Sequence, residues 1–265
     1  MPGWLAIPRD WLASLGDIAR FGGRTMGLVY SGRVFKFFGE ALRQCGILIL
    51  GSTIVIWGLV FILGLTCGIE GAYFNRSVGA PAYAGVFAAW CDLREVIPYA
   101  FGYMMAAKVG TGIVAELGAM RISDEIDALE VMGVQPMIFL CATRLLAAWM
   151  VLPFMYLAGI GVGFFASYIA IVQQIGEVSA GGYFLIFWMF QNPPDLFFSL
   201  IKAMVMATAI ILVGCYYGFT AGGGPVGVGT ATAKSMVLNI VLVHIIGMMG
   251  TLVFWGANPR APIGG

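Results

Sequence analysis

Four ionisable residues lie inside long apolar stretches of this 265-residue chain: Lys108, Glu116, Lys202 and His244. An ionisable side chain in such a stretch is costly and needs a partner, water or a function. The ammonium group of Lys108 or Lys202 suits the carboxylate or phosphate of a lipid whose tails occupy an apolar cavity. The alternatives are snorkelling and pairing with an acid. Both lysines are therefore candidate substrate contacts.

The other polar residues of these stretches favour structural roles. Glu116 lies near the end of its stretch, where it can pair with Arg121, Lys234 or a partner chain. His244 is the only histidine, and a proton relay through it is one interpretation. A neutral histidine hydrogen-bonded between helices is the favoured one. Asn239 is expected to form a hydrogen bond between helices.

The segment 121–136, with the sequence RISDEIDALEVMGVQP, predicts a short acidic helix. Ser123 is a natural N-cap, and Asp124 and Glu125 then fall in the first turn, where the helix dipole favours acids. Gly133 and the proline three residues later predict the end of the helix. A helix of roughly nine residues is too short to be stable alone in water.

The two kinds of side chain on this acidic helix point in different directions. Ile126 and Leu129 share one face, while Asp127 and Glu130 point elsewhere. A short acidic helix with an apolar ridge is suited to docking on a soluble partner. The alternative is an ordinary solvated loop helix.

The composition places these residues in a membrane protein. Hydrophobic residues make up 60% of the chain, charged residues 10%, and the mean hydropathy is +0.93. Soluble domains are about 45–50% apolar and about 25% charged. A soluble enzyme, a disordered tail and a disulfide-stapled secreted module are therefore excluded. The net charge of +1 offers no basic face for nucleic acid.

The apolar stretches predict an all-α integral membrane protein with a single domain over residues 1–265. Residues 1–44 combine basic residues with apolar residues at helical spacing, including Trp11, and predict one or two interfacial amphipathic helices. The acidic helix at 121–136 lies between the second and third spans. Five transmembrane helices are expected at 45–69, 96–120, 145–176, 196–217 and 235–255, joined by external segments at 70–92 and 177–195 and by a loop at 218–233.

The basic residues orient these spans. Six of them precede the first span, the 70–92 segment contains one, and the 177–195 segment contains none. The positive-inside rule therefore places the N-terminus and the acidic helix in the cytoplasm. With five spans the C-terminus is external.

Enzymatic and metal motifs are not expected. The five cysteines, Cys45, Cys67, Cys91, Cys141 and Cys215, form no C-x-x-C motif, so metal or thioredoxin chemistry is disfavoured. A disulfide between Cys67 and Cys91 is left open, because both lie near the external ends of the first two spans. The chain lacks the phosphate-binding pattern G-x-x-x-x-G-K-[ST]. The glycines at 222–227 are best explained by a tight turn.

Two motifs carry a family resemblance. Residues 115–120 (AELGAM), leading into 124–136 (DEIDALEVMGVQP), resemble the signature of the MlaE/YrbE family. These proteins are permease subunits of ABC-type lipid transporters that work with MCE proteins. Residues 218–234 (GFTAGGGPVGVGTATAK) resemble a second family motif. The similarity is collinear over most of the chain and is strongest to the actinobacterial YrbE proteins.

The resemblance implies a non-catalytic permease of the plasma membrane that pairs with a second YrbE-type chain. Two cytoplasmic ATPase subunits would carry ATP and magnesium, so this chain would need no cofactor of its own, and MCE proteins would lie on the outer side. The substrate would be a fatty acid, a mycolic acid or another lipid, and the direction import. Related permeases carry basic residues at the positions of Lys108 and Lys202. The acidic helix would be a coupling helix whose ATPase contacts are Asp124, Glu125, Asp127, Leu129 and Glu130.

Two alternatives come from other functional classes. One is a secondary lipid transporter coupled to protons through Glu116, Lys108 and His244, which the lack of an internal repeat disfavours. The other is a membrane scaffold for envelope assembly that transports nothing. Co-purification with an ATPase would separate both from the ABC permease.

Overall fold

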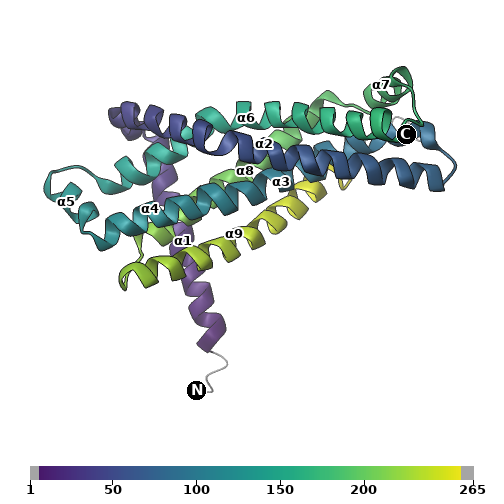
Figure 1. The fold of residues 1–265 in the computed structure, drawn as a ribbon. Coiled ribbons are helices and arrows are strands. Elements are labelled where there is room, and N and C mark those ends of the chain that lie inside the picture. Colours follow the sequence, from purple (N-terminus) through teal and green to yellow (C-terminus); the bar gives the residue numbers. More distant parts are fainter. Residues whose placement is uncertain (1–5, 258–265) are drawn as a thin grey trace. The chain divides into compact units, whose positions relative to one another are not determined.

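A computed structural model describes the backbone of residues 6–257 and the side chains of residues 13–257. The described chain is helical, with no strand among residues 6–257, so the prediction of an all-α protein is confirmed. The predicted role of Trp11 lies outside the described side chains. Figure 1 shows the course of the chain. The α-helices are α1 (Ala6–Tyr30), α2 (Phe38–Ser77), α3 (Ile97–Met104), α4 (Thr111–Ile122), α5 (Glu125–Val131), α6 (Thr143–Tyr168), α7 (Ala180–Met189), α8 (Pro193–Phe219) and α9 (Gly224–Trp255).

Shorter 3-10 and π-helical stretches connect or extend these helices. The 3-10 helices are η2 (Arg33–Phe37) and η3 (Pro81–Ala84), and the π-helices are η4 (Phe87–Val96), η5 (Met105–Gly110), η6 (Met137–Ala142) and η7 (Ile169–Ile175).

Four described helices are long and apolar enough to cross a membrane: Arg33–Ser77, Met137–Ile175, Pro193–Phe219 and Gly224–Trp255. They contain the predicted spans 45–69, 196–217 and 235–255, and all but the last residue of the predicted span 145–176. The remaining predicted span, 96–120, is helical but is divided among α3, η5 and α4, and it is not among the four. The five-span topology stays a prediction.

The loop predicted at 218–233 is wrong in its length. α8 continues to Phe219 and α9 begins at Gly224, so only four residues connect them. Gly223 and Gly224 have φ values of +82° and +72°, a region that L side chains rarely adopt. The tight turn is confirmed, but the threonines and alanines beyond it continue the helix.

The chain also turns sharply before the first candidate span. α1 ends at Tyr30, and Gly32 with φ +73° precedes η2. α1 packs on α8 through Phe21, whose ring lies 5.7 Å from that of Tyr216. A Cβ atom at Gly22 would contact Leu212 at 3.4 Å. The interfacial position of α1 stays a prediction.

The described residues form two compact units. Unit 1 holds the described residues up to Leu48 together with Ala106–Met150 and Thr208–Asn239. Unit 2 holds Ile49–Met105, Val151–Ala207 and the described residues from Ile240. Within unit 1, α1 and η2 pack on η6, and α5 packs on α4. A buried core of unit 2 joins η4, η7 and α7, and consists of Ala72, Ala84, Ala88, Ala89, Ile171, Val178, Tyr183, Phe187 and Phe190.

Candidate transport and coupling sites

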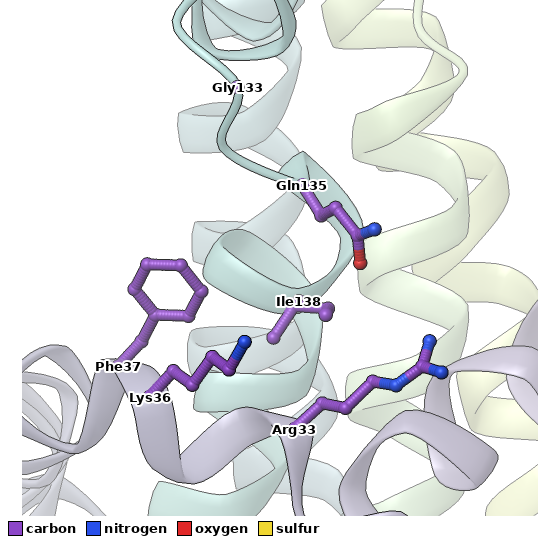
Figure 2. Close-up of a pocket in the computed structure, with 6 residues that line it drawn as sticks. All are labelled: Arg33, Lys36, Phe37, Gly133, Gln135 and Ile138. Carbon is purple, nitrogen blue, oxygen red and sulfur yellow. The ribbon is translucent and has the colours of Figure 1, made fainter.

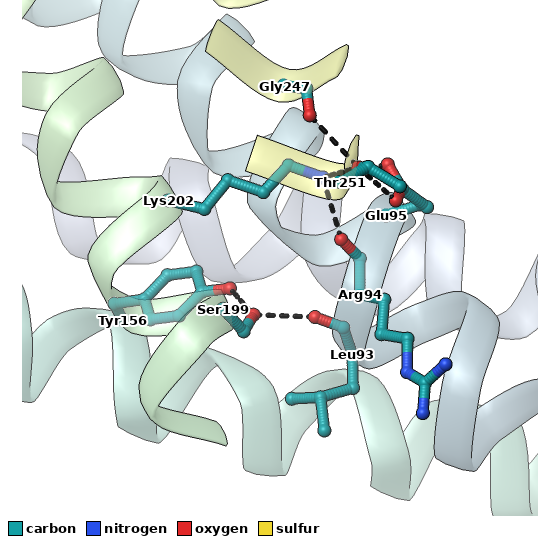
Figure 3. A network of polar contacts seen from close by, with 8 residues as sticks. All are labelled: Leu93, Arg94, Glu95, Tyr156, Ser199, Lys202, Gly247 and Thr251. Carbon is teal, nitrogen blue, oxygen red and sulfur yellow. Dashed lines mark hydrogen bonds and ion pairs between the residues drawn. The ribbon is translucent and has the colours of Figure 1, made fainter. Parts of the chain in front are cut away.

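Lys202 lies in unit 2 with its side chain completely buried. Its ammonium group donates to the Arg94 carbonyl oxygen at 2.9 Å, to Glu95 Oε2 at 2.8 Å and to Thr251 Oγ1 at 2.8 Å. Figure 3 shows the side chain extending from α8 toward these groups on η4 and α9. An ammonium group has three donors, and all three are used. The predicted contact of Lys202 with substrate stays a prediction, and the structure gives this lysine internal partners.

The carboxylate of Glu95 is held from two sides. Besides the ion pair with Lys202, its Oε1 accepts a 2.5 Å hydrogen bond from the hydroxyl of Thr251. The stem of Lys202 passes beside Gly250, where an added Cβ atom would lie 3.2 Å from the lysine Cγ. Because glycine has no side chain, the lysine can extend past this position of α9 to reach η4.

A second ion pair joins η4 to α8. The Arg94 guanidinium donates from Nε and Nη2 to Asp195 Oδ2 at 3.0 and 2.6 Å. Trp255 Nε1 donates to Asp195 Oδ1 at 2.8 Å, and the guanidinium lies 4.4 Å from the ring centre of Trp90. The side chains of Arg94 and Asp195 are both at least 90% buried. Charge-assisted bonds of this kind are the stronger ones, so the pair holds η4 firmly against α8.

Arg94, Glu95 and Asp195 were not predicted from the sequence as members of a site. A usable signal was present, because a buried lysine needs an anion and Glu95 stands one residue before the predicted span 96–120. Their polarity instead suggested boundary residues. A hydrogen-bond chain also runs from Tyr156 through Ser199 to the Leu93 carbonyl, with oxygen–oxygen distances of 2.5 Å.

His244 has hydrogen-bond partners for both ring nitrogens in unit 2. Nδ1 lies 2.9 Å from the Ile240 carbonyl oxygen, which can only accept, so Nδ1 carries a proton. The hydroxyl of Tyr103 lies 3.0 Å from Nε2. Through these two contacts the imidazole joins α3 to α9. The centre of the Tyr99 ring lies 5.8 Å from the centre of the His244 ring and 5.1 Å from the Lys202 ammonium nitrogen. His244 and Lys202 therefore share Tyr99 as a neighbour.

The other predicted polar residues lie in unit 1. Lys108 is on η5, is exposed, and has no ion-pair partner among the described residues. Its contact with substrate stays a prediction. Glu116 pairs at 2.7 Å with Arg144, rather than with Arg121 or Lys234 as expected. Arg144 was not predicted as a partner of Glu116, because the short acidic helix separates the two residues in the sequence. Both lie in unit 1.

Asn239 is completely buried, but its bond differs from the expected one between helices. Its Nδ2 lies 3.4 Å from Ser235 Oγ, one turn earlier on the same helix. Its Oδ1 has no partner among the described residues. Cys67 and Cys91, whose pairing the sequence left open, are free thiols in the structure.

The acidic helix is α5, and it begins later than the sequence indicated. Asp124 precedes it in the left-handed conformation, with φ +59°, and Ser123 caps no helix N-terminus. The Ser123 hydroxyl donates instead to the Ala119 carbonyl at 3.0 Å, so the prediction of an N-cap at Ser123 is wrong. The predicted stop at Gly133 is confirmed, with φ +76° and a 3.0 Å bond from Val134 N to the Leu129 carbonyl that closes the helix end.

α5 is anchored on one side and exposed on the other. Ile126 is 1% exposed, and Leu129 is half-buried. Asp127 forms an ion pair with Arg121 at 2.5 Å, and Glu125 Oε1 lies 3.1 Å from the Ser123 hydroxyl oxygen. Glu130 is exposed with no ion pair among the described residues, and Val131 just beyond it is 89% exposed. The helix thus presents carboxylates beside an uncovered apolar side chain.

A buried carboxylate marks η4, outside the candidate spans. Asp92 is completely buried, and its Oδ2 shares a short hydrogen bond with the Ser167 hydroxyl, whose oxygen lies 2.8 Å from the Gly64 carbonyl oxygen. Its Oδ1 has no partner among the described residues. Burial raises the pKa of Asp92 to about 7, although the bonds from Ser167 and Cys67 oppose that rise.

This carboxylate makes the stability of the fold depend on pH. Because the pKa of Asp92 is higher in the folded than in the unfolded chain, the folded state binds the proton more tightly. Its contribution is complete at acid pH and is lost as pH rises through about 7. We expect the melting temperature of the detergent-solubilised protein to fall between pH 5 and pH 8. Asp92→Asn should flatten that profile, and an equally steep profile would contradict the assignment.

Comparison with known proteins agrees with the family resemblance, and the matched residues include both motifs. The family model described as Permease MlaE matches residues 41–253. A probable ABC transporter permease of Rickettsia prowazekii is 30% identical over 162 residues, which are 61% of this chain and 62% of that protein. The chain thus spans less than two thirds of the length of this relative.

More distant relatives are matched over more of this chain. The chloroplastic protein trigalactosyldiacylglycerol 1 of Arabidopsis thaliana is 29% identical over 82% of this chain and 59% of its own length. An intermembrane phospholipid transport system permease of Haemophilus influenzae is 24% identical over 87% of this chain and 88% of its own length. A permease is a membrane transport subunit and not an enzyme. The match over residues 41–253 places this multi-pass membrane chain in the MlaE permease family.

Proposed function

We propose that the chain is the permease subunit of an ATP-driven lipid transporter in the inner membrane. The relatives support the class, since one is described as a probable ABC transporter permease and another as a phospholipid transport permease. The observation that carries the proposal is α5, an exposed acidic helix anchored through Ile126. Such a helix can transmit force from a soluble motor only if it is fixed to the membrane domain, and this one packs on α4.

In this proposal α5 is cytoplasmic and docks in a groove of an ATPase subunit. Asp124, Glu125, Asp127 and Glu130 supply charge, and Leu129 supplies apolar contact. A second permease chain completes a dimer with two ATPase subunits, and MCE proteins receive or deliver lipid on the outer side. ATP binding moves the two permease chains relative to each other and opens a lipid cavity.

The substrate class in this proposal is a lipid with an anionic head and apolar tails. A phospholipid fits this chemistry, and so do the fatty or mycolic acids that the actinobacterial resemblance implies. The second of the five predicted spans, 96–120, is in this proposal the helical run of α3, η5 and α4, which brings Lys108 into the membrane domain. With an external C-terminus, the ion pairs of Arg94 and Lys202 lie toward the outer side.

Charge reversal on α5 tests the coupling role. Glu130→Lys removes a carboxylate without breaking an ion pair among the described residues, and Asp127→Lys additionally loses its exposed pair with Arg121. Because exposed pairs contribute little to stability, both variants should stay folded. We expect ATPase association to weaken roughly tenfold or more for the double reversal, and ATP hydrolysis to become uncoupled from lipid transport.

The measurement is co-purification of the ATPase subunit in mild detergent, quantified against the permease. Glu70→Lys is the matched control, because Glu70 is an exposed acid on α2 without an ion pair among the described residues. It should retain wild-type association. Full ATPase association by the double reversal would refute docking through α5, and a wild-type chain that purifies without any ATPase would refute the proposed function.

A further inference from the structure

A basic pocket lies in unit 1 between η2 and the chain that follows α5. It has a volume of about 480 Å³ and is lined by Arg33, Lys36, Phe37, Gly133, Gln135 and Ile138. Figure 2 shows Arg33 and Lys36 extending from the same short helix toward the segment that carries Gln135 and Ile138. Packing of η2 on η6 holds the two walls together.

The charges of this pocket are not compensated within the described chain. Arg33 and Lys36 are both exposed, and neither forms an ion pair there. No lining residue is acidic. By contrast, Arg43 on the next helix has Glu40 as a partner at 3.4 Å. Two like charges that share a pocket repel each other, and a bound anion relieves that repulsion.

The donor set specifies the chemistry of that anion. A guanidinium group offers a planar fork that matches phosphate oxygens, and an ammonium group adds a compact charge. The side-chain amide of Gln135 supplies two further donors on the opposite wall. Together these groups suit a phosphate more than a single carboxylate.

The surroundings distinguish a lipid phosphate from a free one. Arg33 is the first residue of the candidate span Arg33–Ser77. Phe35, which lies between the two cations in the sequence, is 60% exposed, and Leu42, six residues after Lys36 in the same candidate span, is 52% exposed, so exposed apolar side chains accompany the cations along the chain. Basic residues next to an apolar segment at the start of a span are typical of contacts with anionic lipids. A free phosphate would leave this apolar surface uncovered.

We propose that this pocket binds the phosphate headgroup of an anionic phospholipid, with the acyl chains lying along the adjoining apolar surface. This site goes beyond the proposed function and does not depend on it. The headgroup joins η2 to Gln135, which lies four residues after Val131, the last residue of α5. A bound lipid therefore fixes the position of the acidic helix relative to the start of the first candidate span.

Native mass spectrometry of the full-length, delipidated protein tests the site, with phosphatidylglycerol and phosphatidylcholine as probes. We expect the wild type to retain phosphatidylglycerol in preference to phosphatidylcholine. Arg33→Gln with Lys36→Gln should weaken phosphatidylglycerol binding at least tenfold, whereas the charge-preserving variant Arg33→Lys with Lys36→Arg should keep most of it. Monodisperse elution shows that each variant is folded.

The matched control is Arg24→Gln with Lys234→Gln, which removes two exposed cations of the same unit that also lack ion pairs among the described residues. It should bind phosphatidylglycerol as the wild type does. Equal loss in this control would overturn the proposal, because the effect would then be one of net charge. Full competition by inorganic phosphate at equal concentration would identify a free-anion site instead. Unchanged lipid binding with lost ATPase association would identify a protein-docking surface.

Discussion

Replacing Lys202 with methionine is expected to destabilise the protein by about 3 kcal/mol, the lower end of the range for breaking a buried ion pair. The lysine side chain is completely buried, while Glu95 retains 36% exposure and can recover some hydration. Without the ammonium group, the Arg94 carbonyl loses its lysine donor as well. Methionine preserves most of the stem beside Gly250, so the loss reports on the charge rather than on packing.

The measurement is the melting temperature of the detergent-solubilised protein, followed by size-exclusion chromatography of heated samples. Lys108→Met is the matched control, because that lysine is exposed and lacks an ion pair among the described residues. Its melting temperature should equal that of the wild type. Adding Glu95→Leu to Lys202→Met should recover part of the loss, since no uncompensated carboxylate then remains. If Lys202→Met melts with the wild type, the network is not structural.

The second large effect is expected at Gly64, where α2 meets α6 in unit 2. A Cβ atom there would lie 2.6 Å from the Gly163 carbonyl oxygen, so Gly64→Ala must push the two helices apart. That shift would also stretch the 2.8 Å bond from Ser167 to the Gly64 carbonyl. We expect a loss of about 2 kcal/mol, typical of overpacking a close contact.

Gly58 on the same helix supplies the control for this substitution. An added Cβ atom there meets nothing within 4 Å. Gly58→Ala should therefore leave stability unchanged or raise it by up to about 1 kcal/mol through helix propensity. Opposite signs for the two glycine-to-alanine variants, measured in the same melting assay, are the expected outcome. Equal melting temperatures would show that the contact between α2 and α6 is loose.

Features set by local sequence were predictable. The scarcity of charge indicated long apolar helices, and four of them lie where expected. Gly133 ends α5 because a glycine tolerates positive φ. The N-cap predicted at Ser123 was wrong because a hydroxyl that can cap a following helix can also bond back to the preceding one, and here it bonds to α4. The start of α9 was misplaced because glycine-rich sequence looks like loop even where the helix continues.

The candidate site was predictable only in part, because its partners are distant in sequence. The depth of Lys202 showed that it needs a counter-charge, but Glu95 is 107 residues away and stands beside polar residues that suggested a loop. π-helical stretches such as η4 and η5 add to the difficulty, because they break the 3.6-residue period on which helical faces are assigned. Pairing of this kind depends on tertiary packing rather than on local propensity.

The long sequence separation between these ion-pair partners also affects how the chain folds during its synthesis. Arg94 and Glu95 leave the ribosome 101 and 107 residues ahead of their partners Asp195 and Lys202. At a synthesis rate of about 5–20 residues per second, they wait roughly 5–20 s for those partners. During that interval these two ion pairs cannot form, so water has to solvate the charges of the nascent η4. Final burial of this segment is therefore a late step of biogenesis, timed by the synthesis of α8.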